Sequence, residues 1–219
     1  MNTNAVIIMM KAPRPGDVKT RLVPPLSHEE AAELYKCFLA DTFSNARKAK
    51  GVDIFASYAP LAQGDDIEGF IPEDIASFPQ EGDGLGERIC NSFRYLFAKG
   101  YKKVCLIGSD SPDMPGYFIT ESFDLLEGET RLVLGPADDG GYYLVAMNGL
   151  SNAPFINIPW STNKVLEETI KRVKESALNF KLLNPWYDID IPFDLPLLKD
   201  NPNAPASSAF LNSLERALY

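Results

Sequence analysis

The sequence predicts an α/β fold, a three-layer, doubly wound arrangement around a mostly parallel mixed sheet of about seven strands. Two observations lead to this fold class. Short apolar runs, AVIIMM at residues 5–10 and VCLI at residues 104–107, are typical of strands that are buried on both faces. Strand-like and helix-like segments alternate along the whole chain, without a linker, repeat or low-complexity tract. We therefore expect a single domain over residues 1–219.

The remaining elements follow from periodicity and from capping residues. Ser27 and Glu30 form a capping-box pattern, which predicts a helix from there to about Lys50. Helical spacing predicts further helices at residues 87–99, 118–126, 163–177 and 207–218, and further strands are expected at residues 52–58, 131–135, within 136–147, and at 180–183. Residues 60–75 are expected to be turn-rich with a short helix. Residues 76–88 are expected to form a glycine-rich loop that passes close to a ligand rather than a packed element.

Composition and charge exclude several classes of protein. A formal net charge of −9 argues against a duplex nucleic-acid partner, because that binding needs a broad basic surface. Small phosphorylated ligands need only a local cluster of cations and stay compatible with this charge. No apolar run has the length of a membrane span, and the first residues lack the features of a signal peptide, so a cytoplasmic location is expected. The sequence leaves the oligomeric state open.

Histidine and cysteine usage narrows the chemistry. His28 is the only histidine, which argues against a Cys/His zinc site, a Ser-His-Asp triad and a Cys-His dyad. Cys37, Cys90 and Cys105 are widely spaced in apolar or helical contexts and are expected to be buried free thiols. Any catalysis therefore has to use carboxylates, lysine, arginine or a metal ion.

An acidic turn follows the central strand. Residues 108–115, GSDSPDMP, place Asp110 and Asp113 where a strand of an α/β sheet ends, which is where such folds bind ligands. Two carboxylates there suit Mg²⁺ or Mn²⁺. The alternative is that Ser109, Asp110 or Ser111 only caps a turn or the next helix.

A cationic loop follows the first strand. Residues 11–22, KAPRPGDVKTRL, carry four cations, and Gly16 permits backbone geometries that other residues resist. Lys11, Lys19 and Arg21, together with the loop's other arginine, can converge on one anion, as in several folds that bind nucleotide phosphates. Neither a P-loop nor a dinucleotide fingerprint is present. A solvated basic loop is the alternative.

Two further acidic clusters stand later in the chain. Residues 138–141, DDGG, precede a strand, although Asp-Gly is also the commonest hairpin turn. Residues 188–194 bring Asp188, Asp190 and Asp194 together beside a proline.

With these segments in view, the chain resembles the glycosyltransferase-A-like nucleotide transferases. It is most similar to an uncharacterised family of nucleotide-diphospho-sugar transferases and more distantly similar to phospholactate guanylyltransferases. The resemblance spans about residues 5–195. It rests on five matches in chain order: the KTRL segment at residues 19–22, Gln80 with the Gly-Leu-Gly at 84–86, the acidic turn at 108–115, the Asp-Gly-Gly at 139–141, and residues 188–195.

The resemblance implies roles for the matching positions. Lys19, Arg21 and Asp110 are the implied catalytic residues, and Asp110 and Asp190 the implied metal ligands. The implied nucleotide-binding residues are Lys11, Gly16, Lys19, Arg21, Gln80, Gly84 and Gly86, with Gln80 at the base edge. The implied acceptor or sugar pocket consists of Asp139, Gly140, Gly141, Tyr142 and Trp160, although Tyr142 and Trp160 could equally pack in the core.

The resemblance implies a transferase that depends on Mg²⁺ or Mn²⁺ and uses a nucleotide-activated donor. The leading hypothesis is glycosyl transfer from a nucleoside diphosphate sugar to a small acceptor. Nucleotidyl transfer with release of pyrophosphate is the alternative, and a non-catalytic nucleotide-binding module is a third. The sequence departs from the family patterns in two ways: the loop has two prolines where nucleotidyltransferases have glycines, and Asp110 and Asp113 do not form a D-x-D motif. The reaction type therefore stays open.

Overall fold

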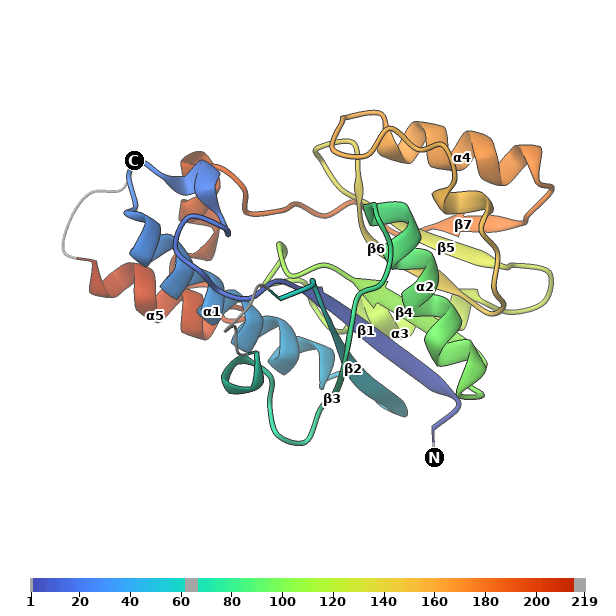
Figure 1. Ribbon diagram of the computed structural model, residues 1–219, viewed down its shortest axis with the longest axis horizontal. Coiled ribbons are helices and arrows are strands. Elements are labelled where there is room, and N and C mark those ends of the chain that lie inside the picture. The colour runs from blue at the N-terminus through green and yellow to red at the C-terminus, as the bar shows by residue number, and fades with distance from the viewer. Residues whose placement is uncertain (1, 62–66, 215–219) are drawn as a thin grey trace.

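One seven-stranded sheet organises the chain, of which a computed structural model describes residues 2–61 and 67–214 (Figure 1). Within these residues the strand order is β3-β2-β1-β4-β6-β5-β7. The strands are β1 (Asn4–Met10), β2 (Val52–Tyr58), β3 (Ala76–Pro79), β4 (Lys103–Ile107), β5 (Leu132–Pro136), β6 (Tyr142–Met147) and β7 (Phe180–Leu182). The chain therefore has the predicted α/β fold with a sheet of the predicted size.

Strand direction places several loops on one edge of the sheet. β1 pairs in parallel with β2 and β4, β2 with β3, and β5 with β7, whereas β6 lies antiparallel between β4 and β5. All strands but β6 thus point the same way, as expected of a mostly parallel mixed sheet. The carboxyl ends of β1, β4, β5 and β7 consequently share one edge, where α/β folds bind their ligands.

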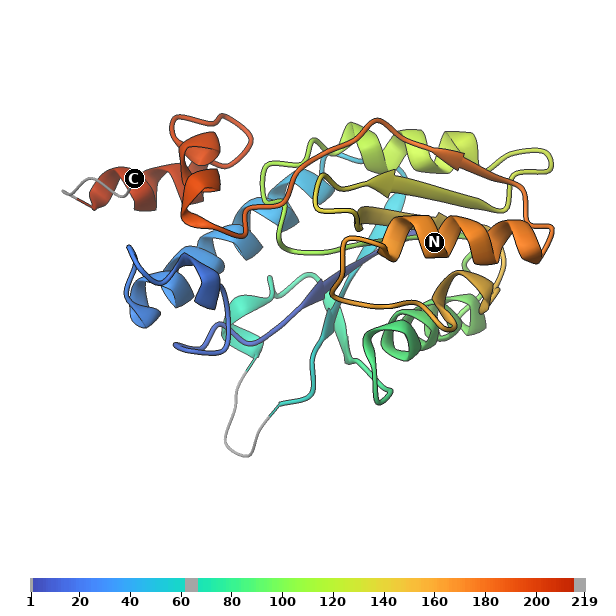
Figure 2. The same cartoon turned by 90° about the horizontal axis from the view of Figure 1, so that it is seen from above.

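Helices cover both faces of this sheet and complete the three layers (Figure 2). One face carries α1 (His28–Ala46) and α3 (Tyr117–Leu125), and the other carries α2 (Leu85–Ala98) and α4 (Val165–Glu175). The final helix, α5 (Pro205–Ser213), packs against α1. Short 3-10 helices stand at η1 (Thr20–Leu22), η2 (Glu68–Phe70), η3 (Ala153–Phe155) and η4 (Pro192–Leu198).

The first strand shows why apolar runs without alternation form the centre of the sheet. Val6 and Ile8 pack into the core on the side of α1, while Ala5 and Ile7 pack into the core on the side of α2. All four are fully buried. A strand with helices on both faces needs apolar residues at every position, which is the pattern that residues 5–10 show.

Local signals predict α1 correctly. The Ser27 hydroxyl accepts a hydrogen bond from the Glu30 amide at 3.1 Å, and the Glu30 carboxylate accepts one from the Ser27 amide at 2.7 Å. This is the predicted capping box. Of the other expected segments, residues 62–66, which lie within the turn-rich 60–75 segment, and residues 215–219, which include the predicted end of the last helix, lie outside the described residues.

The prediction of a loop over residues 76–88 is wrong at both ends. Residues Ala76–Pro79 form the edge strand β3, which pairs with β2 and buries Phe78. Helix α2 then begins at Leu85, after Gly84 as its N-cap. The strand is too short and too exposed on one face for its apolar pattern to stand out.

The three cysteines are free, as expected, with Cys90 and Cys105 buried and Cys37 only partly buried, because it lies on a less covered side of α1. Among the described residues, no helix combines the length and the apolar character needed to cross a membrane.

Candidate active site

The loop after β1 is anchored at two points and strained between them. Val18 and Leu22 are buried in the core. Lys19, between them, adopts a left-handed backbone with φ 47° and ψ 35° and precedes η1. Non-glycine residues in this conformation are uncommon and cluster at functional sites. The loop therefore holds the backbone of Lys19 in an unusual conformation between two buried residues.

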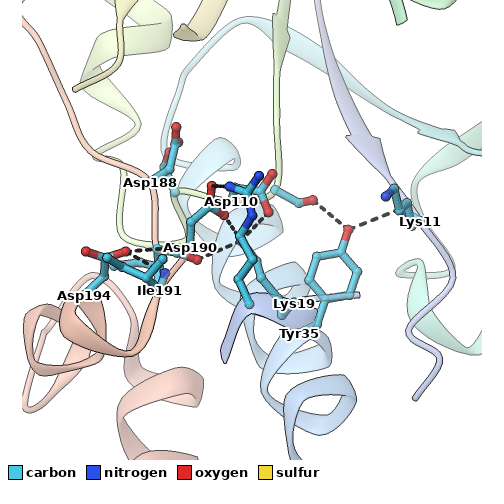
Figure 3. A network of polar contacts seen from close by, with 12 residues as sticks. Lys11, Lys19, Tyr35, Asp110, Asp188, Asp190, Ile191 and Asp194 are labelled. Carbon is cyan, nitrogen blue, oxygen red and sulfur yellow. Dashed lines mark hydrogen bonds and ion pairs between the residues drawn. The ribbon is translucent and has the colours of Figure 1, made fainter. Parts of the chain in front are cut away.

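The Lys19 ammonium lies among three acceptors at the sheet edge (Figure 3). It forms an ion pair with Asp110, lies 3.0 Å from Oδ1 of Asp190, and donates to the backbone carbonyl of Ile189 at 2.8 Å. Only 5% of its side chain is exposed. Burial lowers the pKa of Lys19, but the charges of Asp110 and Asp190 outweigh it, so the net effect raises the pKa. The group is therefore a buried cation at physiological pH.

Asp110 stands directly after β4, where the sequence predicts it. Its side chain is 52% exposed, so one side of the carboxylate faces solvent while the other contacts Lys19. The preceding residue, Ser109, is buried and shares a 2.7 Å hydrogen bond with the hydroxyl of Tyr35 on α1. That hydroxyl also accepts from the Lys11 amide at 3.1 Å. Tyr35 thus joins the start of the cationic loop to the acidic turn.

Burial, with the nearby charge of Asp110, raises the pKa of Tyr35 to about 12. The hydroxyl therefore stays protonated at physiological pH and serves as a fixed donor and acceptor. The sequence gives no sign of this role, because Tyr35 has the helical spacing of an ordinary core residue.

Asp113 has a different place from the one predicted. The sequence suggests that Asp110 and Asp113 face the ligand together, but Asp113 is 1% exposed and accepts hydrogen bonds from three side chains. These donors are the Tyr187 hydroxyl, the Asn201 amide at 2.9 Å and the Trp186 indole at 3.4 Å. The prediction is wrong because a buried carboxylate with three donors is a structural tether. It fixes the segment that carries Asp188 and Asp190.

The segment at residues 186–190 runs beside the acidic turn. The Ile189 amide donates to the backbone carbonyl of Asp110 at 2.8 Å, which places Asp190 next to Lys19. Asp194 then fixes the backbone on the far side, since its Oδ2 accepts from the amides of Asp190 and Ile191, each at 2.8 Å. Within the acidic cluster at residues 188–194, Asp190 therefore contacts Lys19, and Asp194 holds the backbone that carries Asp190.

Asp188 is the most perturbed acid of the site. Burial is the main cause that raises its pKa to about 7, and the charges of Asp110, Asp139 and Asp190 add to it. The Ser111 hydroxyl, which donates to Asp188 Oδ1 at 2.5 Å, acts in the opposite direction. Strongly shifted groups in clusters of like charge are typical of functional sites.

The donor chemistry fits a hard divalent cation. Asp110 and Asp190 already share one cation, the Lys19 ammonium, and carboxylate oxygens are the ligands that Mg²⁺ and Mn²⁺ prefer. Within residues 2–61 and 67–214, no three His, Cys, Asp or Glu side chains are grouped to hold a metal. That does not conflict with the fit, since Mg²⁺ is commonly bound by one or two carboxylates together with substrate phosphates.

Arg21 and Lys11 are the cations that face outward. The Arg21 side chain is 73% exposed, and its guanidinium reaches the second oxygen of Asp190 only at 3.9 Å. Lys11 is exposed where the chain leaves β1. Gly16 has φ +86° with open space around it, so its conformation, not its size, explains the glycine. Both cations are therefore accessible to an anion from solvent.

Of the remaining nucleotide-binding predictions, Gln80 and Gly86 are buried. The Gln80 amide nitrogen donates to the carbonyls of Ser57 at 2.8 Å and Met10 at 3.4 Å, which ties the ends of β1 and β2 together. A Cβ on Gly86 would lie 2.5 Å from the Phe155 carbonyl oxygen, so Gly86 permits close packing and the expected ligand-lining loop is wrong there. Base recognition by Gln80 stays a prediction.

The predicted acceptor residues form a second cluster across the β5–β6 turn. Asp139 accepts from the Gly141 amide at 2.7 Å, and Gly140, at φ +89°, packs against the backbone of Asn163. The rings of Tyr142 and Trp160 meet edge to face with centroids 6.2 Å apart, and burial raises the pKa of the Tyr142 hydroxyl. Asp139 contributes to the shifted pKa of Asp188, so the two clusters are neighbours. The acceptor role stays a prediction.

Comparison with known proteins identifies the family of this chain. The chain belongs to the family described as "Uncharacterized protein conserved in bacteria (DUF2064)", whose match covers residues 42–162. No curated protein matches the sequence.

Solved structures resemble the whole chain. A "putative nucleotide-diphospho-sugar transferase" from Desulfovibrio desulfuricans G20 aligns with a TM-score of 0.88 and 28% identity, over 97% of this chain and 95% of the other. CMP:2-keto-3-deoxy-manno-octonic acid synthetase in complex with CTP aligns with a TM-score of 0.57 and 8% identity, over 96% of this chain and 100% of the other. Rv0371C from Mycobacterium tuberculosis H37Rv, in complex with manganese, aligns with a TM-score of 0.50 and 12% identity, over 85% and 92%. The last two show the fold alone.

Proposed function

We propose that this protein is a metal-dependent transferase that uses a nucleotide-activated donor and moves a sugar from a nucleoside diphosphate to a small acceptor. The observation that carries the proposal is the contact of Lys19 with Asp110 and Asp190, at the edge of the sheet where this fold class binds ligands. The description of the Desulfovibrio neighbour, which is similar over almost the full length, supports the same activity.

In this proposal each group acts on a diphosphate. Arg21 and Lys19 neutralise the negative charge that grows on the diphosphate as it leaves the sugar. Asp110 and Asp190 would hold Mg²⁺ or Mn²⁺, which would supply further positive charge to the leaving diphosphate. Alignment and charge stabilisation account for most of the catalysis in such displacements. A direct attack by the acceptor fits a chain with one histidine and no evident nucleophile.

Nucleotidyl transfer is the second candidate, in which a phosphorylated acceptor attacks a nucleoside triphosphate. The fold shared with a synthetase that binds CTP favours it. The two reactions differ in their by-product. The test is to incubate the protein with Mn²⁺ and either nucleoside diphosphate sugars or nucleoside triphosphates, together with a mixture of candidate acceptors. Release of nucleoside diphosphate supports glycosyl transfer, and release of pyrophosphate contradicts it in favour of the second candidate.

The by-product assay also distinguishes both enzymes from a module that binds nucleotides without turnover. Binding itself is measured by thermal unfolding with nucleotide and Mn²⁺. A ligand at 100 times its dissociation constant adds about 2.7 kcal/mol to the free energy of unfolding, which shifts the midpoint by several degrees. If no nucleotide raises the midpoint, the proposal of a nucleotide-using transferase fails. If nucleotides bind and no by-product forms, the non-catalytic reading replaces it.

A further inference from the structure

The cation that is expected to bind phosphate is already fully engaged by the protein. An ammonium has three N–H donors. Those of Lys19 face three acceptors, namely Asp110, Asp190 and the Ile189 carbonyl, and its side chain is 5% exposed. Conversely, the two carboxylates expected to hold a metal ion both contact Lys19. The groups that must bind donor and metal therefore neutralise each other in this structure.

This mutual neutralisation has an electrostatic reason. Asp110 and Asp190 approach the same nitrogen atom, so without a cation between them their charges would repel each other. Arg21 cannot replace Lys19, because its guanidinium is 3.9 Å from Asp190 and its side chain is 73% exposed. A divalent cation would meet the same need.

We propose that Lys19 and a divalent cation compete for Asp110 and Asp190, so that Lys19 occupies the carboxylate pair in the ligand-free protein and turns to the donor's phosphates when the ion binds. The inference rests on the proposed function for the identity of ion and donor. Val18 and Leu22 are buried on either side of Lys19, so the backbone stays anchored while the flexible four-carbon side chain moves.

Two consequences follow from this competition. The metal ion alone binds weakly, because it has to displace a buried ammonium from its three acceptors. Donor and metal bind with positive coupling, since phosphate oxygens offer the displaced ammonium new acceptors, and each ligand then tightens the other by the same factor.

Metal binding in the absence of any nucleotide tests the competition. Free Mn²⁺ is counted by electron paramagnetic resonance during a titration of the wild type, Lys19→Met and Lys36→Met. The Lys36 variant is the matched control, because it loses the same charge from a surface pair with Glu33. Lys19→Met is expected to bind Mn²⁺ at least about tenfold more tightly than the wild type, as the loss of a neighbouring positive charge requires. Lys36→Met is expected to match the wild type.

A second measurement uses the wild-type protein and does not depend on a folded variant. Lysine acylation by a small reagent is followed by mass spectrometry, with and without saturating Mn²⁺. The acylation of Lys19 is expected to rise several-fold with Mn²⁺, while that of Lys36, already 37% exposed, stays constant.

The outcomes separate this inference from the proposed function. If Lys19→Met binds Mn²⁺ no more tightly than the wild type, or Mn²⁺ leaves the acylation of Lys19 unchanged, competition is refuted while a metal-dependent transferase can still stand. If none of the proteins binds Mn²⁺, competition is refuted as well, and the by-product assay then decides the proposed function on its own.

Discussion

Two isosteric substitutions in the acidic turn, three residues apart, are expected to have opposite effects: one should lower turnover and the other the free energy of unfolding. Asp110→Asn removes a charge from a side chain that is 52% exposed, while Lys19 keeps its contacts with Asp190 and the Ile189 carbonyl. Half-exposed ion pairs contribute roughly 0–1 kcal/mol, so the free energy of unfolding should fall by about 1 kcal/mol or less. Turnover should fall by at least about 100-fold, because the variant loses a metal-binding charge at the diphosphate.

Asp113→Asn should lower the free energy of unfolding more than Asp110→Asn does, and turnover less. The carboxylate accepts from three donors through both oxygens, Oδ2 from Tyr187 and Asn201 and Oδ1 from Trp186. An amide has one oxygen, so at least one buried donor would face an NH₂ group. We expect a loss of roughly 2–4 kcal/mol in the free energy of unfolding. The turnover of the folded fraction should fall less than in Asp110→Asn.

Urea unfolding and turnover, measured on both variants in one buffer, check this pair of expectations. The assignment of Asp110 to the site is refuted if Asp110→Asn loses as much stability as Asp113→Asn, or if it keeps wild-type turnover. Equal turnover loss in both variants would mean that the position of the 186–190 segment, not the charge of Asp110, limits the reaction.

Three further outcomes are expected. Asp41→Ala should lower the free energy of unfolding in urea by roughly 2–4 kcal/mol, because the buried carboxylate accepts three hydrogen bonds at the start of α5, two of them from Ser207. A loss below about 1 kcal/mol would contradict this role. The pKa of Asp188 is raised to about 7 in the folded protein, so the folded state binds this proton more tightly than the unfolded state does. In metal-free buffer, the free energy of unfolding should therefore fall as the pH rises from about 4 to about 7, by at most about 1.4 kcal/mol per pH unit from this group. Asp188→Asn should remove this slope, and parallel pH profiles of the variant and the wild type would refute the assignment. Gly86→Ala should destabilise the protein by roughly 1–3 kcal/mol in thermal unfolding, because its Cβ would lie 2.5 Å from a backbone oxygen. Gly84→Ala has nothing within 4 Å of its Cβ and should cost less, since it loses only the preference for glycine at the N-cap of α2. Equal midpoints for the two variants would show that the packing at Gly86 is not tight.

The sequence predicts those parts of the fold that local patterns determine. Unbroken apolar runs identify the central strands, and the capping box at Ser27 locates the start of α1. The antiparallel direction of β6 leaves no such mark, because its apolar residues are as continuous as those of its parallel neighbours. The sequence also does not predict the short edge strand β3, because its pairing with β2, not its composition, makes it a strand.

At the site, residue type and place in the chain are sufficient to bring Lys19 and Asp110 together, since both follow parallel strands that are adjacent in the sheet. The sequence cannot separate Asp110 from Asp113, because only the tertiary contacts of the 186–201 segment bury the second carboxylate. It also gives no sign of Tyr35, whose hydroxyl acts through two loops that are distant in sequence.

The proposed function requires that Asp110 and Asp190 hold a divalent cation beside a diphosphate that Lys19 and Arg21 contact. A crystal structure of the protein with Mn²⁺ and a nucleoside diphosphate sugar, using the anomalous signal of manganese, tests it most directly. An anomalous peak is expected at ligand distance, about 2 Å, from the carboxylates of Asp110 and Asp190, with the phosphates next to Lys19 and Arg21. A manganese peak and phosphates bound elsewhere on the molecule would contradict it.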